Sequence, residues 1–207
     1  MLKKFENLTD KGKEKSIEIC KAAAKLFNER GYLSTSLGDI ARAAAITKGG
    51  IYHYFSTKEE LLFVILYRYM DKMLQELKRK MDLCNSPEEK IHVFVQLHIY
   101  NYRDNLVESH VLLREKGNLT PEYLKLIQDQ EREYEVILSH LIESLMKKRK
   151  RYSENIKLVT YCLLGMCNWP FTWFDPKGQW SAEDLSEVIY KIFFGGLLSN
   201  FGSRQVD

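Results

Sequence analysis

The residues from Lys48 to His53 place a cation, two glycines and two polar aromatic side chains within six positions. Lys48 can pair with a phosphate, while Tyr52 and His53 supply hydrogen-bonding groups. Gly49 and Gly50 keep the surface slim enough to enter a major groove, and free amides at a helix N-terminus attract phosphate. This pattern indicates DNA binding. The alternative is that the two glycines lie in a loop and that the aromatic side chains belong to a core.

The elements around this stretch favour the first interpretation. Ser36 can cap a short helix, with Asp39 capping in return. Thr47 opens a second, very short helix, and Thr57 opens a third with Glu60 at the reciprocal position. Three helix starts with almost no linker predict a helix-turn-helix followed by a long support helix.

Residues 35–61 resemble the DNA-binding signature of the TetR/AcrR family of transcriptional regulators. The matching residues are Thr35, Ser36, Asp39, Ile40, Ala41, Ala44, Thr47, Lys48, Gly49, Ile51, Tyr52, Tyr54, Phe55, Thr57, Lys58, Glu59, Glu60 and Leu61. One departure is Ala45, where the family usually has glycine in the turn. A positive φ there would cost alanine roughly 1 kcal/mol.

The resemblance implies a DNA interface centred on the second short helix. We expect Lys48, Tyr52, Thr47 and Lys58 to contact the DNA backbone, and Gly50 and His53 to lie nearest the bases. The complete expected DNA-binding set is Thr35, Ser36, Thr47, Lys48, Gly49, Gly50, Tyr52, His53 and Lys58.

Charge is distributed as a phosphate-binding module requires. Residues 1–60 carry 11 Lys and Arg against 8 Asp and Glu, whereas the remainder carries 20 of each. The formal net charge of +3 therefore comes from the expected DNA-binding part. A composition of 45% hydrophobic and 29% charged residues predicts a soluble chain with a substantial core.

No pattern of catalytic or metal-binding residues is evident. The five histidines, at positions 53, 92, 98, 110 and 140, show no HExxH spacing and no nearby nucleophile motif. Cys20, Cys84, Cys162 and Cys167 form no CxxC pair, so we expect reduced, mostly buried thiols. No signal peptide or membrane-spanning run appears. We expect a cytoplasmic protein that is not an enzyme and needs neither cofactor nor metal.

The remaining chain reads as a series of amphipathic helices with short connections. We expect helices over residues 13–30, 57–83, 86–102, 107–116, 120–148, 152–173 and 181–200, with Pro170 kinking the penultimate one. Residues 1–12 read as a flexible basic arm. This predicts an all-α chain with a helix-turn-helix domain at 1–56 and a helical ligand-binding and dimerisation domain at 57–207, linked by the long helix that starts near Thr57.

The C-terminal part resembles TetR-family regulators of fatty-acid and other acyl-CoA catabolism. The residues that carry this resemblance are Leu164, Gly165, Met166, Asn168, Trp169, Trp173, Phe174, Pro176, Gly178, Ser181, Glu183, Asp184 and Leu185. Pro170 departs from the pattern, as does the basic run at 147–151. The resemblance implies an acyl-CoA or similar amphipathic effector; a hydrophobic aromatic compound is the alternative.

We expect the effector to contact Tyr67, His98, Tyr102, Arg103, Trp169 and Trp173. His98 and Tyr102 could equally be satisfied core groups. The basic run could bind the phosphates of the effector, although a solvated helix end is the simpler interpretation and a nuclear signal is a third.

The last two helices carry wide apolar stripes and predict a homodimer. The expected interface residues are Tyr161, Gly165, Leu185, Val188, Ile189, Ile192 and Gly196. The function predicted is a homodimeric repressor that a small molecule releases from a palindromic operator in double-stranded DNA. Two alternatives remain open: a ligand-binding or enzymatic helical protein whose head serves assembly, and a protein that coats DNA without sequence preference.

Overall fold

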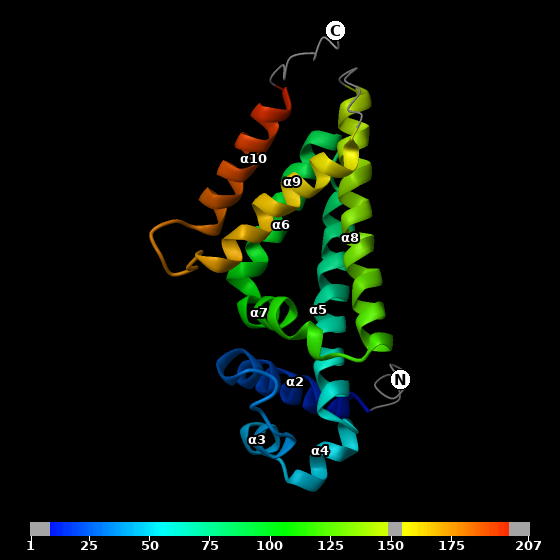
Figure 1. The fold of residues 1–207 in the computed structure, drawn as a ribbon, viewed down its shortest axis with the longest axis vertical. Coiled ribbons are helices and arrows are strands. Elements are labelled where there is room, and N and C mark those ends of the chain that lie inside the picture. The colour runs from blue at the N-terminus through cyan, green and yellow to red at the C-terminus, as the bar shows by residue number, and fades with distance from the viewer. Residues whose placement is uncertain (1–8, 149–154, 199–207) are drawn as a thin grey trace. The chain divides into compact units, whose positions relative to one another are not determined.

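The computed structural model describes residues 9–148 and 155–198, and this part of the chain is built from helices and turns without a strand. The predicted all-α class is confirmed. The α-helices are α2 Asp10–Arg30, α3 Leu37–Ala43, α4 Lys48–Tyr54, α5 Lys58–Met81, α6 Pro87–Asp104, α7 Leu106–Glu115, α8 Pro121–Lys148, α9 Ile156–Asn168 and α10 Ala182–Leu198 (Figure 1). Two 3₁₀-helices, η1 Lys116–Asn118 and η2 Trp169–Thr172, complete the element order.

The chain divides into two compact units that do not follow a single cut in the sequence. Unit 1 comprises residues 1–73 and 106–131, and unit 2 comprises residues 74–105 and 132–207. Helices α5 and α8 therefore each contribute their N-terminal part to unit 1 and the rest to unit 2. No helix within the described ranges combines the length and apolar character needed to cross a membrane.

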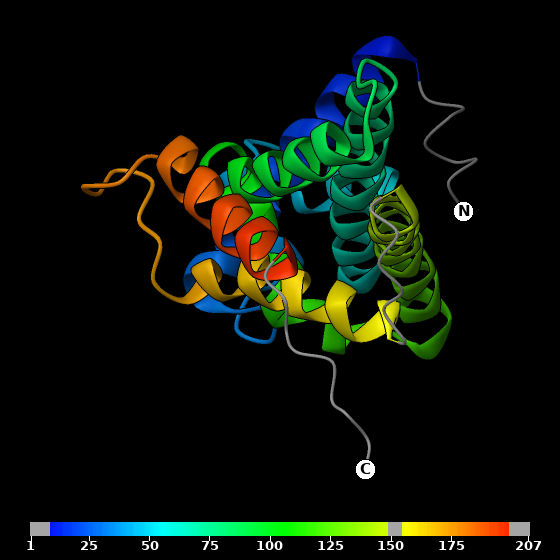
Figure 2. The ribbon, with the colours of Figure 1, turned by 90° about the horizontal axis from the view of Figure 1, so that it is seen from above.

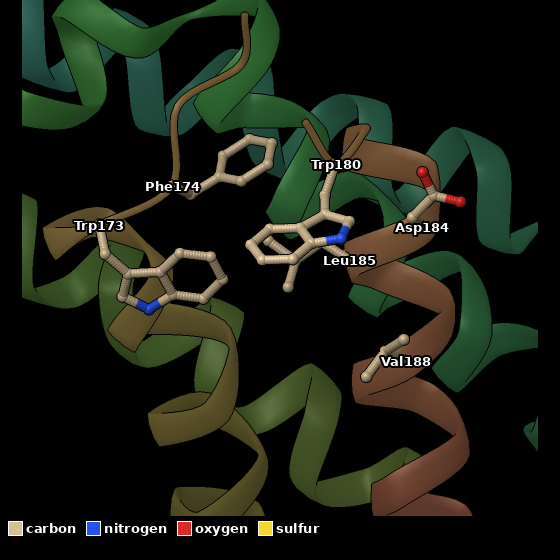
Figure 3. A pocket seen from close by; sticks show the side chains of 6 residues that line it. All are labelled: Trp173, Phe174, Trp180, Asp184, Leu185 and Val188. Atoms are coloured by element: carbon tan, nitrogen blue, oxygen red, sulfur yellow. The ribbon is translucent and has the colours of Figure 1, made fainter. Parts of the chain in front are cut away.

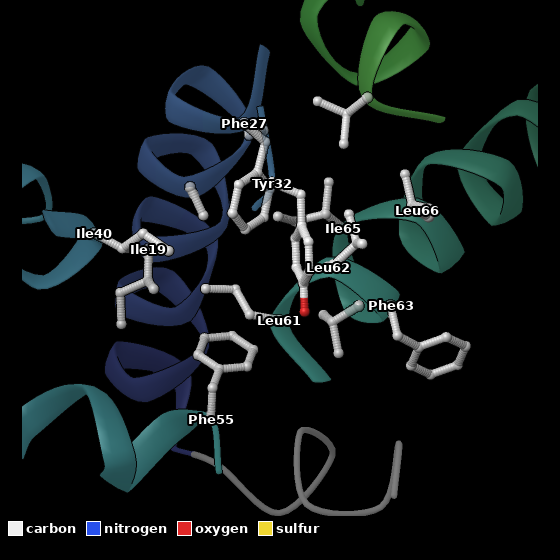
Figure 4. Packing of buried hydrophobic residues seen from close by; sticks show 14 of the residues in the cluster. Ile19, Phe27, Tyr32, Ile40, Phe55, Leu61, Leu62, Phe63, Ile65 and Leu66 are labelled. Carbon is white, nitrogen blue, oxygen red and sulfur yellow. The ribbon is translucent and has the colours of Figure 1, made fainter. Parts of the chain in front are cut away.

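Unit 1 contains the three N-terminal helices, the start of α5 and α7, whose apolar side chains share one core. Its core is formed by apolar side chains from α2, α3, α4 and α5 (Figure 4), including Ile19, Phe27, Ile40, Phe55 and Leu61. Each of these side chains is almost completely buried. Because one shared core fixes all four helices, the helix-turn-helix is held rigidly from behind.

Local signals set the ends of the unit 1 helices. Thr9 caps α2 by accepting the Gly12 amide at 3.2 Å. Gly31 ends α2 with φ +83°, a conformation that L side chains rarely adopt. With Thr9 as its cap, α2 begins at Asp10, so residues 10–12 are helical and are not part of a flexible arm as expected. Residues 1–8 of that expected arm lie outside the described residues.

Unit 2 is organised around α6, which contacts both α9 and α10, while α9 and α10 also contact each other. Figure 2 shows α10 lying alongside these two helices. Ser86 starts α6 by accepting the Glu89 amide at 3.2 Å, and Pro87 occupies its first turn, as its missing amide allows.

Residues 152–173 were expected to form one kinked helix, but the structure shows an α-helix followed by a 3₁₀-helix. The α-helix ends at Asn168 and gives way to the 3₁₀-helix η2, in which Pro170 is buried. Proline lacks the amide that would continue the α-helical ladder. It therefore ends α9 instead of kinking it.

Candidate nucleic-acid interface and effector region

Capping interactions fix the two helices of the helix-turn-helix. The Ser36 hydroxyl accepts the Asp39 amide at 3.1 Å, and the Asp39 carboxylate accepts the Ser36 amide, also at 3.1 Å. Thr47 accepts the Gly50 amide at 3.0 Å. The hydrogen bonds from Ser36 lower the pKa of the Asp39 carboxyl, so this cap stays charged at neutral pH. The predicted starts of both helices are confirmed.

The turn between α3 and α4 carries the strain predicted for Ala45. Its φ is +51°, and within the described ranges it is the only residue other than glycine with positive φ. The Ile46 amide donates to the Ala41 carbonyl at 2.9 Å, and the Lys15 ammonium donates to the Ala44 carbonyl at 3.1 Å. These contacts hold the turn in a conformation that alanine disfavours.

Helix α4 has two distinct faces. Ile51 is buried, and Phe55, which follows the helix, is buried as well. Lys48, Tyr52 and His53 are exposed. The structure therefore anchors one side of this short helix and leaves the side bearing the cation and the polar aromatic groups open, as expected from the sequence.

The two glycines at the start of α4 face different environments. A Cβ added at Gly50 would lie 3.1 Å from the Thr47 Oγ1 atom, so glycine here makes room for the N-cap. A Cβ added at Gly49 would meet nothing within 4 Å. No contact within the subunit therefore requires a glycine at position 49.

Thr35 and Lys58 lie differently from the other residues of the expected DNA set. Thr35 is 2% exposed, and its hydroxyl donates to the Gly31 carbonyl at 2.9 Å. The Lys58 ammonium donates to the carbonyls of Tyr32 and Thr35 at 2.7 and 2.8 Å, and it lies 4.1 Å from the centre of the Tyr32 ring. Partial burial lowers the pKa of Lys58. Thr35 thus ties the loop between α2 and α3 to the end of α2, and Lys58 ties the same loop to the start of α5.

His98 is the centre of a buried polar cluster in unit 2. Its Nδ1 lies 3.2 Å from the Tyr134 hydroxyl and its Nε2 lies 3.1 Å from the Asn168 Oδ1 atom. Burial lowers the pKa of His98 to about 4, so the ring is neutral. Because an amide oxygen can only accept, Nε2 carries the proton and Nδ1 accepts from Tyr134. The cluster ties α6 to α8 and to the end of α9.

The residues expected to contact the effector are divided between the two units. Tyr67 belongs to unit 1, whereas His98, Tyr102 and Arg103 belong to unit 2. Tyr102 is buried beside His98, with their ring centres 5.9 Å apart. Trp169 and Trp173 are 67% and 48% exposed.

The cations expected near the effector are engaged by carboxylates. Arg103 pairs with Asp104 at 2.7 Å and also with Glu183. Lys147 pairs with Glu143 at 2.7 Å, and Lys148 pairs with Glu88 at 3.0 Å. Residues 149–151 of the basic run lie outside the described residues. Both described lysines therefore make exposed ion pairs at the end of α8.

The expected dimer residues separate into two sets on α9 and α10. Tyr161, Val188 and Ile192 are exposed, as is Gly165, while Leu185 and Gly196 are partly covered. Ile189 is 6% exposed and packs inside its own subunit. The exposed members form an apolar stripe on each helix.

Two protein-family models match this chain. The one described as bacterial regulatory proteins of the tetR family covers residues 19–65, and the one described as a tetracyclin repressor-like C-terminal domain covers residues 84–197, more than half of the chain. The chain belongs to the TetR family. Its family is one of transcriptional regulators, so the chain is a helix-turn-helix regulator and not an enzyme.

Individual TetR-family proteins are similar over most of the length. The transcriptional repressor KstR2 of Mycolicibacterium smegmatis is 24% identical over 191 residues, which cover 91% of this chain and 93% of the relative. A TetR/AcrR-family regulator from Thermobifida fusca is 32% identical, with a TM-score of 0.71 and coverage of 90% and 100%. AibR in complex with isovaleryl coenzyme A and operator DNA is 26% identical, with a TM-score of 0.79 and coverage of 86% and 97%.

Three residues important to this TetR-family chain were absent from the site residues expected from sequence. Tyr134 and Asn168 complete the His98 cluster, and Lys15 supports the turn at Ala45. Tyr134 lies on an apolar stripe, and Asn168 lies within the C-terminal motif. The sequence therefore singled out both residues but gave no sign that they contact His98. Nothing in the spacing connects Lys15 to a carbonyl 29 residues away.

The expected cysteine environments are partly corrected. Cys167 is buried and Cys20 is partly buried, and burial raises the pKa of both thiols to about 12, which disfavours the reactive thiolate. Cys84 is partly covered, and Cys162 is exposed because it lies on the outward side of α9.

Proposed function

We propose that this TetR-family protein is a homodimeric repressor that binds a palindromic DNA operator through the exposed face of α4. In this proposal Lys48, Tyr52 and Thr47 contact the DNA backbone, while Gly50 and His53 lie nearest the bases. Such a protein works in the cytoplasm, where bacterial DNA is found. DNA recognition belongs to residues 1–56, and ligand binding and dimerisation belong to residues 57–207.

The observation that carries the proposal is the contrast between the two faces of α4. Its back is fixed by Ile51 and Phe55, and its front presents Lys48 and an unobstructed Gly49. A helix that is rigid behind and slim in front suits the major groove, where its first turn can come close to the DNA. The complex of AibR with operator DNA supports the same use of this fold.

A footprint on DNA tests the proposal directly. The purified protein should protect one short palindrome near its own gene and should not protect a scrambled sequence of the same composition. Half-sites are expected about one helical turn apart, because two-fold-related heads meet successive major grooves. Equal affinity for the scrambled duplex would instead indicate a DNA-coating protein, and no binding to either duplex would contradict the proposal.

The effector is proposed to be an acyl-CoA. The supporting observations are the binding of isovaleryl coenzyme A by AibR and the buried, mostly apolar environment around Phe94, His98 and Tyr102. Each methylene of an acyl chain buried there would contribute roughly 0.8 kcal/mol. Arg103 and Lys148 are paired with carboxylates, so effector phosphates that bind either cation would displace Glu183 from Arg103 or Glu88 from Lys148.

A ligand panel separates the acyl-CoA from other apolar compounds. Isovaleryl coenzyme A and longer acyl-CoAs should raise the melting temperature and release the operator at concentrations where the matching free acids do neither. Free coenzyme A serves as the control for the head group alone. If only uncharged aromatic compounds cause release, the effector class is wrong while the repressor stands.

A further inference from the structure

Aromatic side chains gather around a pocket at the connection between η2 and α10 (Figure 3). The pocket has a volume of about 250 Å³ and is lined by Trp173, Phe174, Trp180, Asp184, Leu185 and Val188. In Figure 3 the three aromatic rings surround the space, and the Asp184 carboxylate points away from them. That carboxylate accepts the Ser181 amide at 3.1 Å and the Ser181 hydroxyl at 2.7 Å, as the cap of α10.

The chemistry of this lining restricts what can occupy the pocket. Because the carboxylate is used in the cap and turned outward, the interior offers ring faces and aliphatic groups and almost no polar partner. A pocket without convergent polar groups does not orient a small polar ligand. Its volume also lies below the roughly 300–1,000 Å³ of typical small-molecule pockets. One apolar side chain fits both the size and the chemistry.

The pocket is accompanied by further exposed apolar side chains on the same elements. Seven side chains on α9, the connection and α10 are exposed to at least 45%: Leu158, Tyr161, Trp169, Trp173, Trp180, Val188 and Ile192. Together they leave on the order of 900 Å² uncovered, whereas one partner of a standard protein–protein interface contributes about 800 Å². The largest apolar patch on a typical monomer is only about 300–600 Å².

The extent of this surface decides between a small ligand and a protein partner. A ligand that fills the pocket would cover Trp173 and Trp180 but would leave Leu158, Tyr161 and Ile192 in water. A second copy of the same chain can cover the whole surface, because a two-fold interface pairs each patch with itself.

We propose that the aromatic pocket is a socket that receives an apolar side chain of the partner subunit in the homodimer. The inference rests on the proposed dimer and adds the connection between η2 and α10 to its interface. Two-fold symmetry creates two such sockets, each filled from the exposed stripe of the other subunit. Trp173 then belongs to the dimer contact instead of the effector site.

The tryptophans provide a readout that is specific to this surface. The chain has 3 tryptophans, and Trp169, Trp173 and Trp180 all belong to the exposed set. Their emission should shift to longer wavelength when the protein is diluted. This shift should follow the dissociation of the dimer measured by sedimentation, because separation of the subunits returns the indoles to water.

Two variants test the socket from opposite directions. Trp180→Ala removes one wall, and Val188→Phe fills the space from inside. Both residues are about half exposed, so neither change should unfold the subunit, and circular dichroism checks this. Each should raise the Kd of the dimer roughly 10- to 100-fold, the range typical of an interface hot spot. Leu83→Ala removes an exposed apolar side chain after α5 and should leave the Kd unchanged.

The possible results distinguish an error in the socket proposal from an error in the homodimer proposal. If the wild-type chain dimerises and both variants keep its Kd, the socket is wrong and the partner subunit does not enter this pocket. If the wild-type chain remains monomeric at every concentration, the proposed homodimer is wrong and the socket falls with it. If isovaleryl coenzyme A protects the indoles of a monomeric variant from iodide quenching, the pocket is an effector site and the socket is overturned.

Discussion

The helix-turn-helix and the surface formed by α9, η2 and α10 differ in how their apolar side chains are used. Around α4 the large apolar groups, such as Ile51 and Phe55, are buried within the subunit, and the outer face is polar. On α9 and α10 large apolar groups such as Trp169 and Ile192 face outward. The first region is complete in one subunit and is ready for a polar partner. The second leaves large apolar side chains uncovered within the described subunit, as at protein interaction surfaces.

The largest expected effect comes from a charge on the outward face of α10. Ile192→Glu would bury an unpaired carboxylate in the dimer, which typically costs about 3–5 kcal/mol. The Kd of the dimer should rise roughly 200- to 5,000-fold in sedimentation experiments. Lys191→Glu reverses the charge of its exposed neighbour and serves as the matched control. An unchanged dimer in both variants would place the interface on another surface.

A pH titration of stability tests the His98 cluster. The folded-state pKa of about 4 lies below the ordinary value of 6.5, so the neutral ring stabilises the fold above pH 6.5. This stabilisation is lost as the pH falls from 6.5 to 4, and it amounts to at most about 3 kcal/mol. Urea unfolding should therefore show a steeper acid loss for the wild type than for His98→Gln, which retains hydrogen-bonding groups but does not titrate. Parallel pH profiles of the two proteins would refute the assignment.

Substitutions of two lysines near the helix-turn-helix distinguish a residue that stabilises the fold from one that contacts DNA. Lys58→Met removes two charge-assisted hydrogen bonds to carbonyls and should lower stability by about 2 kcal/mol. Lys48→Met should leave stability unchanged and reduce the slope of operator affinity against salt by about one unit. The salt slope of Lys58→Met decides whether Lys58 also contacts the DNA backbone, as expected from the motif. A reduced slope would give it both roles.

Gly49 tests whether close approach by another molecule explains its identity. Gly49→Ala adds a methyl group into open space and should raise helix stability by up to about 1 kcal/mol. Operator affinity should nevertheless fall about tenfold, if the DNA backbone passes over this turn. Melting temperature and operator titration measure the two effects on the same sample. An increase in stability without a loss of affinity would show that DNA does not approach Gly49.

The smallest effect is expected in the turn between α3 and α4. Ala45→Gly should relieve the strain of φ +51° and stabilise the fold by up to about 1 kcal/mol. Ala43→Gly, two residues earlier in helical conformation, should destabilise by a similar amount. If both substitutions destabilise equally, the positive φ of Ala45 costs nothing in this turn.

The sequence by itself determined those features that depend on neighbours a few residues apart. The caps at Ser36 and Thr47 and the buried backs of α3 and α4 follow from residue type and local spacing, whereas the positive φ at Ala45 was expected from the family resemblance. Interactions of this kind are made within one turn of a helix, so a linear pattern contains both partners. The all-α class and the family followed from the same signals.

Only the tertiary structure decided which side chains are enclosed and which remain exposed. The tie from Lys58 to Tyr32 and Thr35, the contact of His98 with Tyr134 and Asn168, and the outward position of Trp173 join residues that are distant in sequence or depend on which helix face is covered. An amphipathic pattern in the sequence shows that one face of a helix is apolar, but it does not show which element packs against that face. For α6 the cover is α9 and α10 of the same chain, whereas the outer stripes of α9 and α10 have no cover within the described subunit. That difference depends on the packing of whole helices, because a stripe buried within the subunit and a stripe exposed for a partner have the same periodicity.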